Sequence, residues 1–222
     1  MKILAIDTTS EVCGVAILED ENLIIENSLC NGLTHSENLM PLIKEALEKA
    51  KTNLKEIELI ACCTGPGSFT GIRIGVASIK ALAEVNNIKI AEVTSLESLA
   101  KNIKSESSTK VSLIDARNNQ CYCGIFDNEI NLKEEYLADD INILLEKISK
   151  YPNITFIGNG AELHKDLILD KINNAVIDEN NSQTAYSCGI IGIKKFKENK
   201  LENADTILPN YLRKSQAERL KK

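Results

Sequence analysis

Two stretches of the sequence, about half a chain apart, carry the same pattern. Residues 4–17 and 113–125 each consist of an apolar strand, an Asp at its end, a polar turn and a second apolar strand. At a constant separation of 108 positions, the identical pairs are Ile6 with Ile114, Asp7 with Asp115, Cys13 with Cys121 and Ile17 with Ile125. Because the separation is close to half the length of the chain, the repeat predicts two duplicated α/β lobes, each opening with an antiparallel hairpin.

The composition indicates an aliphatic core and argues against a protein that binds nucleic acid by itself. The chain has 222 residues, of which 43% are hydrophobic and 4% aromatic. The core is therefore aliphatic, and few side chains are available to stack on unpaired bases. The formal net charge is −6, whereas a protein that holds nucleic acid by itself needs a basic surface. We interpret the basic stretches Lys194–Lys197 and Arg213–Lys222 as a solvated helix face and a chain end.

The cysteines and the N-terminus predict a cytoplasmic protein. There are seven Cys and no C-x-x-C spacing, so the patterns of zinc ribbons and thioredoxin-like sites are absent. Met1 and Lys2 lead directly into a strand, without the pattern of a signal peptide. No apolar run reaches the ~18 residues of a membrane span. Reduced thiols in the cytoplasm fit these features.

Strands and helices alternate along the chain after each hairpin. The pattern predicts a first lobe at 1–105 and a second lobe at 106–222, with a C-terminal helix that can return to the first lobe. The stretch Ser105–Lys110 is the best candidate for a linker. Expected strands cover 2–7, 12–18, 23–28, 57–63, 88–93, 111–126 (a hairpin) and 154–157. Expected helices cover 36–50, 69–85, 95–104, 141–150, 161–170 and 186–200.

The turn Asp7-Thr8-Thr9 has two interpretations. Backbone N–H groups and hydroxyls in such a hairpin can hold phosphate, and a carboxylate at a strand end can hold hydrated magnesium. The alternative, which the pattern alone favours, is a turn in which the Asp and Thr side chains bond nearby amides. The second copy keeps Asp115 but lacks the hydroxyls.

The string Gly65-Pro66-Gly67-Ser68-Phe69-Thr70-Gly71 lies between a buried strand and a helix. A helix N-terminus is a potential anion site. However, the string lacks the Gly-Lys-Ser/Thr of a phosphate-binding P-loop, and its glycines have the wrong spacing for a dinucleotide site. Gly71 and Gly75 leave one helix face bare, which favours close packing against another backbone, inside the fold or from a partner.

The helix predicted at 36–50 carries a broad apolar stripe. Thr34 and Glu37 have the spacing of a capping box that opens this helix. The stripe is expected to face the sheet, and its breadth leaves room for a partner helix. The two histidines, His35 and His164, are too far apart in the chain for a paired metal motif. A structural role is expected for His35.

Five segments together resemble the bacterial TsaB (YeaZ) family, and the similarity covers nearly the whole chain. They are Ala5–Ser10, Thr34–Pro41, Gly65–Gly75, Asp115–Arg117 and Pro209–Arg213. The resemblance implies two actin-like lobes of the sugar kinase/actin superfamily, with ribonuclease H-like mixed sheets flanked by helices. It also implies a part in making threonylcarbamoyladenosine next to the anticodon of tRNA.

The resemblance implies that this chain is a noncatalytic scaffold. The resemblance implies a complex with the transferase TsaD, a paralogue, and with the ATPase TsaE, and a homodimer when the chain is alone. Transferases of the TsaD type carry His-x-x-x-His on the first helix, and here Leu39 replaces the second His. The resemblance therefore implies no metal site and no tightly bound cofactor on this chain, with ATP or ADP and metal held by TsaD and TsaE. Contact with tRNA is implied only through the complex, and no contact with a membrane is implied.

The resemblance also assigns residues to sites. Asp7, Thr8 and Thr9 would form a vestigial phosphate loop, and Gly65, Pro66, Gly67 and Ser68 a structural glycine-rich loop. The partner interface carried over from the family consists of His35, Leu39, Leu42, Ile43, Ala46, Leu47, Gly71, Arg73, Gly75, Ile79 and Leu82. The alternative function is a stand-alone ATP-dependent kinase-like enzyme of the same fold, which Asp7-Thr8-Thr9 motivates.

Overall fold

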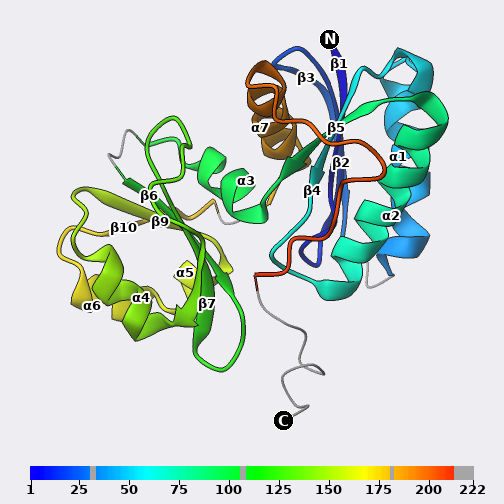
Figure 1. Ribbon diagram of the computed structural model, residues 1–222. Helices are drawn as coiled ribbons and strands as arrows, with labels where there is room; N and C mark the ends of the chain where they lie inside the picture. Colours follow the sequence, from blue (N-terminus) through cyan, green and yellow to red (C-terminus); the bar gives the residue numbers. More distant parts are fainter. Residues whose placement is uncertain (31–33, 106–108, 181–182, 213–222) are drawn as a thin grey trace. The chain divides into compact units, whose positions relative to one another are not determined.

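The computed structural model describes residues 1–30, 34–105, 109–180 and 183–212 (Figure 1). The chain divides into two compact units, each with its own core. Unit 1 consists of Met1–Lys101 and Gln183–Pro209, and unit 2 of Asn102–Ser182 and Asn210–Lys222. The predicted basic tail, 213–222, and the centre of the predicted linker, 106–108, lie outside the described residues.

Unit 1 is built on a mixed five-stranded sheet. Its strands are β1 (Lys2–Asp7), β2 (Cys13–Glu19), β3 (Asn22–Leu29), β4 (Leu59–Cys63) and β5 (Lys89–Val93), in the order β3-β2-β1-β4-β5. The hairpin strands β1, β2 and β3 pair antiparallel, and β1, β4 and β5 pair parallel. The continuous apolar run of β4 is buried at every residue, as expected for a central parallel strand.

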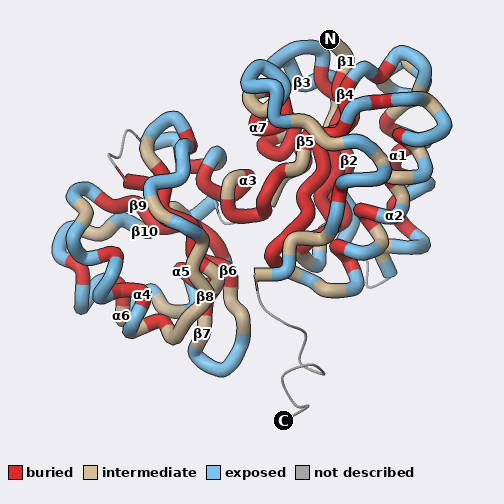
Figure 2. The backbone as a smooth tube through the Cα atoms, viewed as in Figure 1, coloured by how far each residue is buried: buried red, intermediate tan, exposed pale blue. Residues whose placement is uncertain are grey.

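Helices cover both faces of this sheet. The helices α1 (His35–Lys49) and α2 (Phe69–Asn86) lie on one face, and α7 (Ala185–Lys197) lies on the other (Figure 1). A single 3-10 turn, η1 (Leu54–Glu56), precedes β4, and α3 (Ser95–Asn102) follows β5. Burial concentrates in the strands, which form the red centre of unit 1 in Figure 2. The first turns of α1 and α2 lie beside the loop that follows β1, where His35 contacts Ser10 and Gly71 contacts Thr8.

The C-terminal helix returns to unit 1, as the sequence analysis allowed, and the segment after it as far as Pro209 also belongs to unit 1. Helix α7 packs on the sheet through two glycines. A Cβ atom on Gly189 would lie 2.7 Å from Leu18 Cδ1, and one on Gly192 would lie 2.6 Å from Ala61 Cβ. After α7, Ile90 and Glu202 pair as a bridge, and Ile207 is fully buried in the core under α1 and α2. The segment after α7 therefore ties the two faces of unit 1 together.

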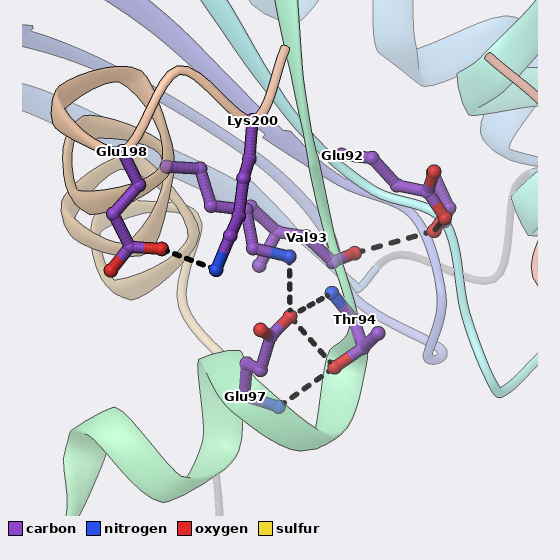
Figure 3. Close-up of polar contacts among 8 residues, drawn as sticks. Glu92, Val93, Thr94, Glu97, Glu198 and Lys200 are labelled. Carbon is purple, nitrogen blue, oxygen red and sulfur yellow. Dashed lines mark hydrogen bonds and ion pairs between the residues drawn. The ribbon is translucent and has the colours of Figure 1, made fainter. Parts of the chain in front are cut away.

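A polar network joins α3 to α7 within unit 1 (Figure 3). The Oε2 atom of Glu97 accepts hydrogen bonds from the Thr94 amide at 2.8 Å and the Thr94 hydroxyl at 2.9 Å, which caps the start of α3. The same oxygen accepts a hydrogen bond from Lys195 Nζ at 2.9 Å. The two side chains of this pair are only 14% and 19% exposed. The pair therefore holds the end of β5 against the returning helix.

Unit 2 repeats the sheet order of unit 1. Its elements are β6 (Thr109–Asp115), β7 (Gln120–Phe126), β8 (Leu137–Asp140), α4 (Ile141–Ile148), β9 (Ile154–Ile157), α5 (Asn159–Leu163), α6 (Lys165–Lys171) and β10 (Val176–Ile177). The order β8-β7-β6-β9-β10, with the first pairs antiparallel and the last pairs parallel, matches β3-β2-β1-β4-β5. The predicted duplication is confirmed. The single helix expected at 161–170 is two short helices that meet at His164.

The strand register corrects the alignment of the two copies. Asp7 faces Gly14 across the first hairpin, and Asp115 faces Cys121 across the second. The second hairpin loop is thus one residue shorter, so a separation of 108 holds for the first strand and 107 for the second strand. Gly14, and not Cys13, is the structural counterpart of Cys121. The predicted pairings of Cys13 with Cys121 and Ile17 with Ile125 were wrong for this reason.

Candidate functional site

The loop after β1 is closed by its own side chains. Asp7 is 3% exposed, and its Oδ1 atom accepts hydrogen bonds from the Thr9 amide at 2.8 Å and the Thr9 hydroxyl at 2.7 Å. The Thr8 hydroxyl donates to the carbonyl of Gly71 at 2.8 Å. The Ser95 hydroxyl in turn donates to Thr9 Oγ1 at 2.9 Å. This is the locally bonded Asp-Thr turn that the residue pattern favoured.

The glycine-rich string packs directly on this loop. The Ser68 amide donates to the Thr9 carbonyl at 2.7 Å, and a Cβ atom on Gly67 would lie 2.1 Å from the same oxygen. A Cβ atom on Gly71 would lie 2.0 Å from the Thr8 carbonyl oxygen, and one on Gly75 would lie 2.4 Å from Thr8 Oγ1. Distances below 3.0 Å leave no room for a side chain. The glycines are therefore required by close packing inside unit 1.

This packing decides how well the loop fits a nucleotide phosphate. A phosphate would need free N–H and hydroxyl donors at the loop or at the start of α2. The Thr9 amide and both threonine hydroxyls are already engaged, as is the Ser68 amide. The Gly71 amide donates to Ser68 Oγ at 3.2 Å, capping α2. These five donors are therefore not free to bind a phosphate group in the folded loop.

Asp7 is the one residue of this loop with an unsatisfied atom. Its Oδ2 atom is buried and has no hydrogen-bond partner among the described residues. Burial raises the pKa of this carboxyl above its usual value, while the bonds from Thr9, the Cys63 thiol and the charge of His35 act in the opposite direction. Folding therefore shifts the protonation equilibrium of this carboxyl toward its neutral form, relative to the unfolded chain.

His35 lies at the start of α1, beside the same loop. Its Nε2 atom is 2.8 Å from the carbonyl oxygen of Ser10, and its Nδ1 atom is buried without a partner. Leu39, one turn further along α1, is 1% exposed and belongs to the core cluster of unit 1. The position that would carry a second histidine is thus filled by a core residue, and His35 holds the loop through Ser10.

The structure places much of the expected interface inside unit 1. The apolar stripe of α1 and the glycine face of α2 pack against their own sheet and loop, because each stripe is needed to fill the core. The buried members are Leu39, Leu42, Ile43, Ala46, Gly71, Gly75 and Ile79. These side chains are buried in the core of unit 1, so their place in a partner interface stays a prediction. The accessible members are His35, Leu47, Arg73 and Leu82.

Other apolar side chains of these helices are accessible instead. Met40 on α1 is 47% exposed and Val85 on α2 is 84% exposed. An open groove of about 320 Å³ runs along α1 and the turn before β4. Its lining residues are Met40, Ile43, Lys44, Leu47, Glu48, Thr52, Asn53 and Leu54. Met40 and Val85 are not among the interface residues that the family resemblance implied, because that set follows the apolar stripe and these two residues lie off it.

The corresponding loop of unit 2 is built differently. Asp115 Oδ1 accepts the amide of Arg117 at 2.9 Å, and the Asp115 amide donates to Asn159 Oδ1 at 2.9 Å. A Cβ atom on Gly160 would lie 3.0 Å from the carbonyl carbon of Leu113. In the sequence, the Asp of each copy is the signal that could locate both loops. The different closures are not visible there.

Two further findings concern the described residues as a whole. Within residues 1–30, 34–105, 109–180 and 183–212, no three His, Cys, Asp or Glu side chains gather as they would around a metal ion. No helix in those same ranges has the length and apolar character needed to cross a membrane.

The chain was compared with known protein families and with curated sequences. The family model described as "TsaD: tRNA N6-adenosine threonylcarbamoyltransferase" matches residues 32–221. The tRNA threonylcarbamoyladenosine biosynthesis protein TsaB of Bacillus subtilis is 31% identical, and the match covers 98% of this chain and 96% of that protein.

Solved structures show the same arrangement of strands and helices. A Pseudomonas aeruginosa protein described as similar to peptidase YeaZ superposes with a TM-score of 0.83 at 23% identity, over 96% of this chain and 99% of that one. The activator of 2-hydroxyisocaproyl-CoA dehydratase from Clostridium difficile superposes with a TM-score of 0.55 at 10% identity, over 90% and 97% of the two chains. The two mixed sheets flanked by helices have the predicted actin-like fold.

Proposed function

Because this chain belongs to the TsaB (YeaZ) family of tRNA threonylcarbamoyladenosine biosynthesis proteins, we propose that it acts as a noncatalytic scaffold for a TsaD-like transferase. The observation that carries the noncatalytic part is the closed loop after β1. Its donors bond to Asp7, Gly71 and Thr9, and the second histidine position holds the core residue Leu39. These donors are engaged within the protein and are not free to hold a substrate or a nucleotide.

The accessible apolar residues of α1 and α2 support the scaffold part. A single exposed apolar side chain is common on protein surfaces, but several such side chains on adjacent helices are typical of a protein interface. Met40 and Val85 lie on the two helices, and the groove along α1 adds apolar surface with a rim of Lys44 and Glu48. The partner surface of our proposal consists of these residues together with His35, Leu47, Arg73 and Leu82.

The rest of the proposed assembly follows from the family. The chain pairs with a TsaD-like paralogue, and a TsaE-like ATPase joins the pair. Nucleotide and metal are held by those two proteins, and tRNA is contacted only through the complex. When no paralogue is present, the chain forms a homodimer through the same surface. The complex works in the cytoplasm.

The proposal is tested by mixing the chain with the TsaD-like paralogue of the same organism and measuring the mass of the complex by light scattering. Val85→Glu and Met40→Glu place a charge where apolar contact is expected, and burying an unpaired charge at an interface costs about 2–5 kcal/mol. Both variants are expected to weaken the complex at least tenfold without unfolding unit 1.

Phe196→Glu is the matched control, since Phe196 is 39% exposed on α7, at the other face of the sheet. Equal affinity of all four proteins would remove α1 and α2 from the interface. A chain that stays monomeric and binds ATP at micromolar concentration by itself would instead support the kinase-like enzyme.

A further inference from the structure

Two neighbouring threonines of the loop after β1 bond to different helices of unit 1. The Thr8 hydroxyl donates to the carbonyl of Gly71 in α2 at 2.8 Å. Thr9 Oγ1 instead accepts the hydroxyl of Ser95, the first residue of α3, at 2.9 Å. The two side chains therefore hold separate parts of unit 1, although they are adjacent in the chain.

The Thr9 hydroxyl lies where three segments of unit 1 meet. The residue is 2% exposed, and its hydroxyl donates to Asp7 Oδ1 at 2.7 Å while accepting from Ser95. The Oε1 atom of Gln183 lies 3.4 Å from the same oxygen. A hydroxyl has one proton to donate and two lone pairs to accept with. A single oxygen atom thus contacts the end of β1, the start of α3 and the residue two positions before α7.

The segments held by Thr9 are those through which the chain leaves and re-enters unit 1. The first part of unit 1 ends at Lys101, in the last turn of α3, and its second part begins at Gln183, just before α7. These two segments are far apart in the sequence. Tertiary contacts, and not chain connectivity, must therefore keep them together.

Further bonds join α3 directly to α7. The Ser98 hydroxyl donates to the Thr184 carbonyl at 3.4 Å, and Lys195 Nζ donates to Glu97 Oε2 at 2.9 Å. The Thr184 hydroxyl in turn accepts the Ser187 amide at 3.1 Å and caps the first turn of α7. A displacement of α3 would therefore disturb the start of α7.

The hydroxyls of this network are buried, which makes each bond expensive to lose. Ser95 and Ser98 are both fully buried. A buried hydroxyl without a partner destabilises the fold, because it has given up its bonds to water. Removal of the Thr9 hydroxyl takes the acceptor from Ser95 and one of the donors from Asp7. The loss is therefore felt in β1 and in α3 at the same time.

We propose that Thr9 is a positioning residue whose hydroxyl makes the loop after β1, helix α3 and the first turn of α7 open and close as one cooperative unit. Proteins open locally in groups of segments whose contacts depend on one another. Here the contacts of Thr9 and Ser98 connect the three segments, so the exit and the return of the chain are released together. This inference goes beyond the proposed function and concerns the chain without its partners.

The experiment is hydrogen exchange of the full chain alone, followed by mass spectrometry at several low urea concentrations. Thr9→Ala is expected to raise the exchange rates of α3 and of the first turn of α7 together, by about tenfold. Thr9→Ser returns the hydroxyl without the methyl group, and it is expected to bring both rates back to within about twofold of the wild type. The comparison of these two variants separates the hydroxyl from the packing of the side chain.

Thr8→Ala is the matched control, because it removes the neighbouring hydroxyl, which bonds to α2. It is expected to speed exchange in the first turn of α2 and to leave α3 and α7 unchanged. Ser95→Ala removes the other partner of the Thr9 bond and is expected to speed exchange in both α3 and the first turn of α7. Since both substitutions break the same bond, the double variant is expected to exchange at about the rate of Thr9→Ala.

Three results would overturn the inference, and each of them leaves the scaffold function standing. Faster exchange of Thr9→Ala in only one of the two segments, or in neither, would show that they open independently. Equal rates for Thr9→Ala and Thr9→Ser would assign the effect to packing and not to the hydroxyl. A rise that extends equally to the central strand β4 would indicate a loss of global stability, with no local unit.

Discussion

Gly71 lies so close to Thr8 that a Cβ atom on the glycine would fall 2.0 Å from the threonine carbonyl oxygen. The Thr8 hydroxyl also donates to the carbonyl of Gly71 at 2.8 Å, so the two backbones are locked together. This contact joins the loop after β1 to the first turn of α2. It explains why a string that resembles an anion site is used for packing.

Gly71→Ala is expected to destabilise the protein by about 3 kcal/mol, because the added methyl group meets backbone and not a flexible side chain. Urea denaturation monitored by circular dichroism measures the change. The neighbouring exposed residue supplies the control, and Thr70→Ala is expected to change the free energy of unfolding by less than about 0.5 kcal/mol. Equal stabilities for the two variants would show that α2 does not pack on Thr8 as described.

Leu39 and Met40 are adjacent in the chain but differ in burial, at 1% and 47% exposed. Leu39→Ala leaves a cavity in the core of unit 1 and is expected to cost about 2–5 kcal/mol of stability. Met40→Ala is expected to cost about 0.5 kcal/mol or less and to weaken partner binding instead. Thermal melting and light scattering with the TsaD-like paralogue separate the two effects. A stable Leu39→Ala that no longer binds the partner would return Leu39 to the interface.

Asp7 gives a pH dependence with a defined sign. Its pKa is raised in the folded protein, mainly by burial, from an ordinary value of 3.8. The folded state therefore binds more protons than the unfolded state, and stability is lost as the pH rises from about 3.8 toward the raised pKa.

Asp7→Asn keeps an oxygen for the two bonds from Thr9 and removes the titrating group. The variant is expected to gain stability relative to the wild type as the pH rises through this interval, as measured by urea unfolding at a series of pH values. Wild-type and variant curves that run parallel would mean that Asp7 does not titrate differently in the fold.

Lys195 and Lys197 both lie on α7, and each forms an ion pair. The pair of Lys195 is largely buried, and the pair of Lys197 is exposed. The Lys195–Glu97 pair is 19% and 14% exposed, and the Lys197–Glu21 pair is 66% and 65% exposed. Lys195→Met leaves Glu97 without its cation and is expected to cost about 2 kcal/mol, less than a fully buried pair would. Lys197→Met is expected to cost about 0.5 kcal/mol or less, since solvent screens exposed pairs. Urea denaturation of the two variants measures the difference. Equal losses of unfolding free energy would show that the Lys195–Glu97 pair does not hold α3 against α7.

Local patterns in the sequence predict most of the fold. The strand-Asp-turn-strand repeat predicts the duplication, and the apolar run that ends at Cys63 predicts the buried parallel strand. The return of α7 to unit 1 depends on Gly189 and Gly192 meeting Leu18 and Ala61, residues far away in the chain. Contacts between residues so far apart in the chain are fixed by tertiary packing, and the local periodicity of the sequence does not reveal them.

The site is less predictable than the fold, for a related reason. Apolar spacing shows that Leu39, Leu42 and Ile43 share one helix face, but it cannot say whether a sheet or a partner covers that face. The left-handed backbone conformation of Arg117, with a φ of +63°, could not be predicted from the sequence either, since arginine has no preference for positive φ. The Asp at each strand end could be identified from the sequence, and the different closures of the two loops could not.

The most direct measurement is the formation of threonylcarbamoyladenosine in tRNA, with activated threonylcarbamoyl donor, by three preparations: this chain alone, the TsaD-like paralogue alone, and the two together with the TsaE-like ATPase. The scaffold account predicts no modified nucleoside from the chain alone and a rate with the complete set that Val85→Glu lowers. Modified tRNA from the purified chain by itself would contradict it.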